Sequence, residues 1–227
     1  MKVRRLGPLC VVATLALLLQ PLGPAASGGS DKVVNIYHKE VETHPSQGDI
    51  RVIEGATAIL SASEKGIFAS ISTKELVPGN AYTLWFVAIN APENCENSPC
   101  KGSDVLKLSE KTQSDVGYGD GLVAGPDGKG EFATFVPVGK LRQAWIGHGL
   151  QKPLSAEIHL VLHDHGPLLA DKVSTMIGSY RGGCRDESLP EIVPATAKSD
   201  GAPGPNDCKL VQDVIFIQGD GQAAQVQ

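Results

Sequence analysis

The chain has 227 residues, of which 41% are hydrophobic and 5% aromatic, and its formal net charge is −5. It contains 26 glycines and 15 prolines, a proportion above average usage that favours a fold with many turns over a helical bundle. This composition excludes a coiled coil, a disordered acidic chain and a multi-span membrane protein. The length suits one large domain or two small ones, and either can bury a sizeable core.

Residues 1–27 have the order of a secretory signal peptide. Basic residues stand at positions 2, 4 and 5, an apolar run covers 6–19, and small residues occupy 25–27. The run is short and flanked by proline, which makes it a poor membrane span. We therefore expect a secreted, periplasmic or envelope protein whose mature chain has no transmembrane segment; an uncleaved anchor is the alternative.

Short strands separated by turns are predicted for the first half of the mature chain. Residues 33–37 form a β-rich run, and 56–63 and 67–73 flank Glu64-Lys65-Gly66 as in a hairpin. The strongest strand signal covers 81–90, where both alternating sets of residues are largely apolar, as expected for a central strand covered on both faces. Residues 104–112 are the most helix-like piece.

The second half continues this pattern. A second hairpin is predicted from 121–125 and 131–138 around a Pro-Asp-Gly turn, and further strands at 156–163, 173–180 and 209–218. About nine strands without long helices predict an all-β fold, an antiparallel β-sandwich of the Greek-key type or a related barrel. We expect one domain over 31–218, with a long loop at 185–207 and a flexible tail at 219–227.

Four cysteines remain after the predicted signal peptide, and in an exported chain an even number favours disulfides. Three pairings are open for Cys95, Cys100, Cys184 and Cys208. We expect local pairing, Cys95 with Cys100 across a turn-forming stretch and Cys184 with Cys208 around the proline-rich loop. A four-cysteine zinc site is the alternative, but the chain has no Cys-x-x-Cys spacing.

Three of the six histidines fall within seven residues: His159, His163 and His165. His159 and His163 lie on the polar face of the strand predicted at 156–163, and His165 follows where that strand meets a Gly-Pro turn. Two residues along a strand span about 6.6 Å, so the side chains of His163 and His165 could hold one transition metal, copper or zinc. His148, between two glycines on a preceding loop, is the third candidate ligand. Other candidates are Asp164, His38 and His44. The alternative is a solvated strand face that needs no ligand.

The charge of the mature chain bears on its partners. Loss of residues 1–27 removes three basic and no acidic residues, which leaves 17 basic against 25 acidic residues, a net charge of −8. Nucleic acids and anionic membranes bind concentrated Lys and Arg, so neither is expected. A protein or a small ligand remains as the expected partner.

Several segments resemble a group of exported bacterial β-rich proteins of uncharacterised function. They are residues 77–85, 90–95, 157–161, 165–167 and 182–184, together with Cys100 and Cys208. The resemblance implies export, an all-β fold and local disulfides, and it implies no activity.

A second, local resemblance concerns His163-Asp164-His165-Gly166-Pro167, which is similar to histidine-bearing strand ends of chordin-type (CHRD) repeats and copper/zinc superoxide dismutases. A dismutase-like site would need further spaced histidines, including a bridging one, which this chain lacks. The resemblance therefore implies metal binding more than redox catalysis.

From these observations we expect a disulfide-stabilised binding or structural module of unknown ligand, rather than an enzyme. The alternative is a copper- or zinc-binding protein that uses His163, His165 and His148. A superoxide dismutase-like enzyme is the third hypothesis.

Overall fold

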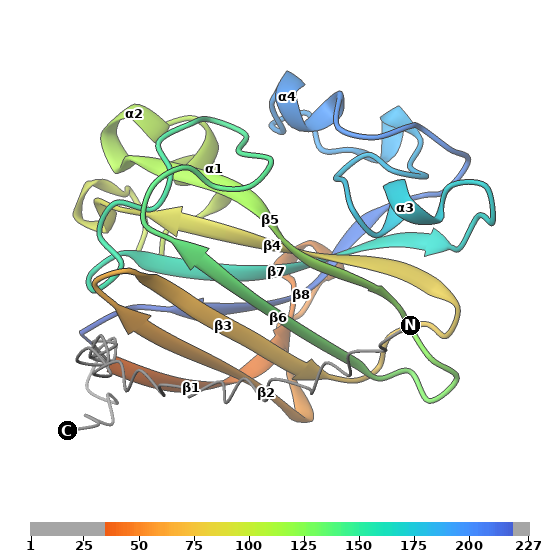
Figure 1. Ribbon diagram of the computed structural model, residues 1–227, viewed down its shortest axis with the longest axis horizontal. Helices are drawn as coiled ribbons and strands as arrows, with labels where there is room; N and C mark the ends of the chain where they lie inside the picture. The colour runs from red at the N-terminus through yellow and green to blue at the C-terminus, as the bar shows by residue number, and fades with distance from the viewer. Residues whose placement is uncertain (1–34, 220–227) are drawn as a thin grey trace, which may run out of the picture. The chain divides into compact units, whose positions relative to one another are not determined.

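In the computed structural model, residues 35–219 are described, and all of them fall in one compact unit that begins at Asp31. Residues 1–27, predicted as a signal peptide, and 220–227 of the predicted tail lie outside the described residues. The eight strands are β1 (Asn35–Thr43), β2 (Val52–Ser63), β3 (Gly66–Thr73), β4 (Asn80–Ile89), β5 (Ser114–Val123), β6 (Gly130–Pro137), β7 (Glu157–Pro167) and β8 (Lys209–Phe216) (Figure 1).

All eight strands belong to one antiparallel sheet with the order β5-β4-β7-β8-β1-β2-β3-β6. The sheet curls until its two edge strands approach each other, and the backbone N–H of Ala133 on β6 donates to Asp120 of β5 at 2.9 Å. The predicted antiparallel all-β fold is confirmed. The structure has one nearly closed sheet rather than two separate sheets, so the predicted sandwich is not confirmed.

The first predicted hairpin is present, formed by β2 and β3. Ser63 pairs with Gly66 across the two-residue turn between β2 and β3. Gly66 has φ +152°, and a Cβ there would lie 2.3 Å from the carbonyl oxygen of Val136, so glycine is required where β3 passes β6. The second hairpin prediction is wrong: the turn does connect β5 to β6, but these two strands are the opposite edges of the sheet, and β5 pairs with β4 whereas β6 pairs with β3. Strand β5 begins at Ser114, seven residues before the predicted strand.

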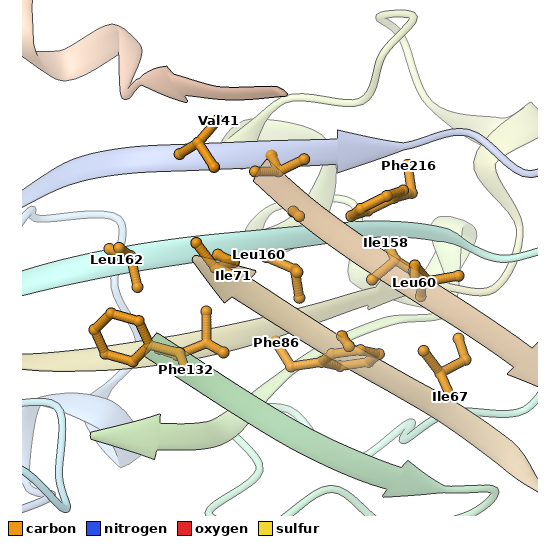
Figure 2. Packing of buried hydrophobic residues seen from close by; sticks show 14 of the residues in the cluster. Val41, Leu60, Ile67, Ile71, Phe86, Phe132, Ile158, Leu160, Leu162 and Phe216 are labelled. Carbon is orange, nitrogen blue, oxygen red and sulfur yellow. The ribbon is translucent and has the colours of Figure 1, made fainter. Parts of the chain in front are cut away.

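The inner core lies inside the curled sheet. Alternate residues of β4 (Tyr82, Leu84, Phe86 and Ala88) and of β7 (Ile158, Leu160 and Leu162) point inward and meet apolar residues from β1, β2, β3, β6 and β8 (Figure 2). The other set on β4, which includes Trp85, Val87 and Ile89, belongs to a second cluster on the outer face. Strand β4 is buried along its whole length, as the sequence predicts for a strand covered on both faces.

Loops and short helices form this outer layer. The α-helices are α1 (Gly102–Leu106), α2 (Ser109–Thr112), α3 (Val173–Met176) and α4 (Ala195–Lys198), and the 3-10 helices are η1 (Pro45–Gln47), η2 (Pro92–Asn94) and η3 (Asp186–Ser188). Figure 1 shows the α-helices gathered on the side of β4, β5 and β7, with α1 and α2 at one end and α3 and α4 at the other. None of the helices in residues 35–219 has the length and apolar character to cross a membrane.

One strand prediction in this layer is wrong. Residues 173–180 were expected to form a strand because β-branched residues alternate there, but the structure has the helix α3 and a turn. The helix places Met176 in the interior, where its sulfur accepts a hydrogen bond from the backbone N–H of Leu169. The tertiary contact outweighs the local β-propensity.

Candidate functional site

Strand β7 places its three histidines on the outer face, because they alternate with Leu160 and Leu162 of the inner core. This face is not solvated. His163 and His165 retain 1% and 0% of their exposure, because the segment that carries Tyr180 and Cys184 covers them. His159 retains 8% and is hydrogen-bonded to Glu157. The alternative interpretation, a solvated strand face that needs no ligand, is therefore wrong for these histidines.

His163 and His165 lie side by side, with ring centroids 4.4 Å apart, as their spacing predicted. Both ring nitrogens of His165 are hydrogen-bonded: Nδ1 donates to the carbonyl oxygen of Gly182 at 2.8 Å, and Nε2 lies 2.8 Å from Thr83 Oγ1. Thr83 in turn accepts a hydrogen bond from Trp85 Nε1. Burial lowers the pKa of His165 to about 4, so the ring is neutral and held in one orientation.

His163 has a different environment. Its ring stacks on Tyr180 with centroids 4.5 Å apart, and its Nδ1 is buried without a hydrogen-bond partner among the described residues. Burial, and secondly the neighbouring His165, hold the pKa of His163 well below its ordinary value. A buried nitrogen without a partner is costly and calls for an explanation.

The third predicted ligand, His148, lies beside Glu110. Its Nε2 is 3.5 Å from Glu110 of α2, and the backbone N–H groups of Gly147 and Gly149 on either side donate to Asp115. Among the described residues, the only group of three ligand-type side chains within 4.8 Å of one another is His163, Cys184 and Cys208. His148 thus does not join His163 and His165 in such a group.

Of the remaining candidates, Asp164 is occupied by Asn80 and by the hydroxyl group of Tyr82. His44 lies at the start of η1, where its Nδ1 accepts a hydrogen bond from Ser46, and His38 lies exposed on β1.

Both disulfides form as predicted, Cys95 with Cys100 and Cys184 with Cys208. The first holds the loop before α1, where the backbone N–H of Cys100 donates to Glu157 at 2.8 Å. The second closes the segment 185–207 beside His163 and His165, and Cys184 Sγ is 3.5 Å from His165 Nδ1. Each disulfide therefore anchors a loop of the outer layer.

A large cleft lies between these two loops, and it was not predicted. We call it the outer cleft; its volume is about 810 Å³. Its walls come from β4, β5, β7 and β8, from residues 44–50 and from the loops at 97–106 and 190–193, with Trp85, Trp145 and Tyr180 among them. The three aromatic rings are in mutual contact, with centroids 4.6 to 5.3 Å apart. The volume and the mainly apolar wall are typical of small-molecule sites.

A few polar groups line the outer cleft. His159 Nε2 is 2.7 Å from Glu157 Oε1, which also accepts the N–H of Cys100. Asp213 retains 9% of its exposure, and no hydrogen bond or ion pair to its carboxyl group is found within residues 35–219. Burial, and secondly the charge of Glu42, raise the pKa of Asp213 from 3.8 to about 7.

Little in the amino-acid sequence predicts this cleft. Trp145 lies near His148 in the chain, but the residues that form the cleft come from segments more than 100 residues apart. Asp213 and His159 meet the same space because β7 and β8 are paired, with Val161 opposite Asp213 and His159 opposite Ile215. That pairing is a property of the tertiary fold, and no local pattern encodes it.

Comparison of the chain with models of protein families, with curated proteins and with solved structures finds no match.

Proposed function

We propose that this protein is a disulfide-stabilised binding module whose outer cleft takes a small, mainly apolar molecule that carries one hydrogen-bond donor group. The observation that carries the proposal is the outer cleft itself, about 810 Å³ in volume. Its size falls within the range of small-ligand sites, and a mostly apolar wall with a few polar groups is the usual composition of such sites.

The chemistry of the ligand follows from Asp213. A carboxyl group that is nearly buried and has no donor among the described residues pays a desolvation cost that a bound donor would offset. An amine or a hydroxyl group can supply that donor, whereas a carboxylate would place a second negative charge near Asp213 and Glu157. The proposed ligand is therefore an apolar amine or alcohol.

In this proposal the curled sheet is the rigid scaffold. Its inner face packs the hydrophobic core, and the ligand binds on its outer face, as it could on a Greek-key sandwich. The two disulfides fit a function outside the cell, where such bonds persist. The predicted signal peptide gives the same location.

The test is calorimetric titration with octylamine, octanol and octanoate, which share one apolar chain length. We expect the amine to bind most tightly and the carboxylate least, and the affinity for the amine to rise with pH as Asp213 ionises near pH 7. Asp213→Asn should reduce the preference for the amine over the alcohol. Equal affinities for all three compounds, unchanged in the variant, would contradict the assigned role of Asp213.

The metal-binding and dismutase hypotheses stay predictions. His163 Nδ1 is buried without a partner and His165 lies beside it, which favours metal binding. Both nitrogens of His165 are hydrogen-bonded, however, so a site that uses His163 and His165 together must break one of these bonds.

A further inference from the structure

The cluster of His163, Cys184 and Cys208 contains two sulfurs that are joined in a disulfide and one imidazole. One ligand-type atom from each residue lies within 4.8 Å of the other two, and all three residues are buried. As a disulfide, the sulfurs are poor metal ligands, because thiolates are the form that binds metals. The cluster would become a ligand set only after reduction.

The backbone holds the two cysteines together independently of the disulfide. The N–H of Arg185 donates to the carbonyl oxygen of Asn206, and the N–H groups of Gly204 and Asn206 donate to Cys184 and Gly183. The Cα atoms of Cys184 and Cys208 are 5.5 Å apart. Two thiolates bound to one tetrahedral zinc ion at about 2.3 Å lie about 3.8 Å apart, a separation that side-chain rotation alone can reach from this backbone.

His163 supplies the third ligand. Its Nδ1 has no hydrogen-bond partner within the described residues and its side chain is almost fully buried, so the nitrogen is free to coordinate. His165 is a poorer candidate ligand, because both of its ring nitrogens already make hydrogen bonds, to Gly182 and to Thr83. Two thiolates and a neutral imidazole around a divalent ion give an uncharged complex, which an apolar interior tolerates far better than an isolated charge.

We propose that reduction of the Cys184–Cys208 disulfide converts this cluster into a zinc-type metal site with His163, Cys184 and Cys208 as ligands and water in the fourth position. A dithiol supplies the two electrons and two protons: the S–S bond breaks, two thiols form, and the dithiol becomes a cyclic disulfide. Both thiol protons are released when the metal binds. The disulfide then acts as a redox switch between two states of the segment 185–207: one closed by the disulfide, the other held by the bound metal. This inference does not depend on the outer cleft.

The test uses Co(II) as a spectroscopic probe of the zinc site. The protein is prepared with Cys10, Cys95 and Cys100 replaced by serine, so that Cys184 and Cys208 are its remaining cysteines, and is reduced with a phosphine, which does not compete as a thiol. We expect one Co(II) per chain with thiolate charge-transfer bands and the intense visible bands of tetrahedral cobalt. We expect neither in the oxidised protein, and Zn(II) should displace the cobalt.

His163→Gln should weaken binding by at least about 100-fold, since even outer-shell partners of metal sites are worth about 10- to 100-fold. The matched control is His148→Gln, which removes a histidine beside Glu110 and should leave the spectrum unchanged. Near-ultraviolet circular dichroism of the oxidised His163→Gln variant checks that it is folded. No cobalt–thiolate band in the reduced protein, or equal binding by a folded His163→Gln variant, would overturn the proposal.

Discussion

The carboxyl group of Asp213 is buried on the outer face, opposite Glu42 of β1, and this position raises its pKa to about 7. A carboxyl group whose pKa is higher in the folded than in the unfolded chain stabilises the fold at low pH, and this contribution is lost as the pH rises from about 4 to 7. His44, which lines the same cleft, has a pKa lowered to about 4, mainly by burial, and contributes the opposite slope. Comparison with a single variant separates the two effects.

We predict that Asp213→Asn gains stability relative to the unmodified protein as the pH rises through this window, by up to about 4 kcal/mol. The measurement is urea denaturation at a series of pH values between about 4 and 8. Asp127→Asn, at an exposed turn, is the matched control and should follow the unmodified protein. A constant difference between Asp213→Asn and the unmodified protein across this range would show that Asp213 has an ordinary pKa.

At the residue scale, sequence reasoning placed His163 and His165 together correctly, because a spacing of two along a strand brings side chains to the same face. It could not predict their burial or their partners. Gly182 and Tyr180 reach these rings from a loop 17 residues further along the chain. A loop that crosses a sheet face leaves no periodic signal in the strand that it covers.

At the element scale, strand prediction succeeded where alternation and turn chemistry agreed, as for β2, β3 and β4. It failed at 173–180, where β-branched residues alternate but the chain forms the helix α3 and a turn. The two disulfide pairings were predictable because each closes a segment of turn-forming residues. The near closure of the sheet was not predictable. It depends on how close the two edge strands, β5 and β6, come to each other, and the sequence of neither strand alone determines that.

The two disulfides should contribute unequally to stability. Cys184–Cys208 spans 24 residues and Cys95–Cys100 spans five. In the chain-entropy model, replacement of both cysteines by serine then costs about 3.5 kcal/mol for the longer loop and about 2 kcal/mol for the shorter. The measurement is chemical denaturation of Cys184→Ser/Cys208→Ser and Cys95→Ser/Cys100→Ser, each the control of the other.

Limited proteolysis adds a readout for the loop itself. The segment 185–207 has few apolar anchors besides Leu189, Val193 and Ala197, so removal of Cys184–Cys208 should create new cleavage sites within it. Removal of Cys95–Cys100 should not. The assigned anchoring role would be wrong if both variants were cleaved in the same places.

At the scale of the whole molecule, the curled sheet divides the hydrophobic core on its inner face from the polar and aromatic residues on its outer face. The inner cluster is built almost entirely from apolar side chains of seven strands, whereas the buried histidines, both disulfides and both tryptophans of the chain belong to the outer layer. A scaffold of this kind can hold a binding surface rigidly while the covering loops vary. The outer cleft lies in this outer layer. The central claim is that a small apolar ligand occupies it.

The most direct test is to fill the cleft and measure octylamine binding by titration calorimetry. Ile215 of β8 is half-buried and lines the outer cleft, so Ile215→Phe should reduce the affinity for octylamine by at least about tenfold, or 1.4 kcal/mol. Val123→Phe, which enlarges an exposed residue of β5 away from the cleft, is the matched control and should bind as the unmodified protein does. Equal octylamine affinities in the folded Ile215→Phe variant and the unmodified protein would contradict the assignment of the outer cleft as the binding site.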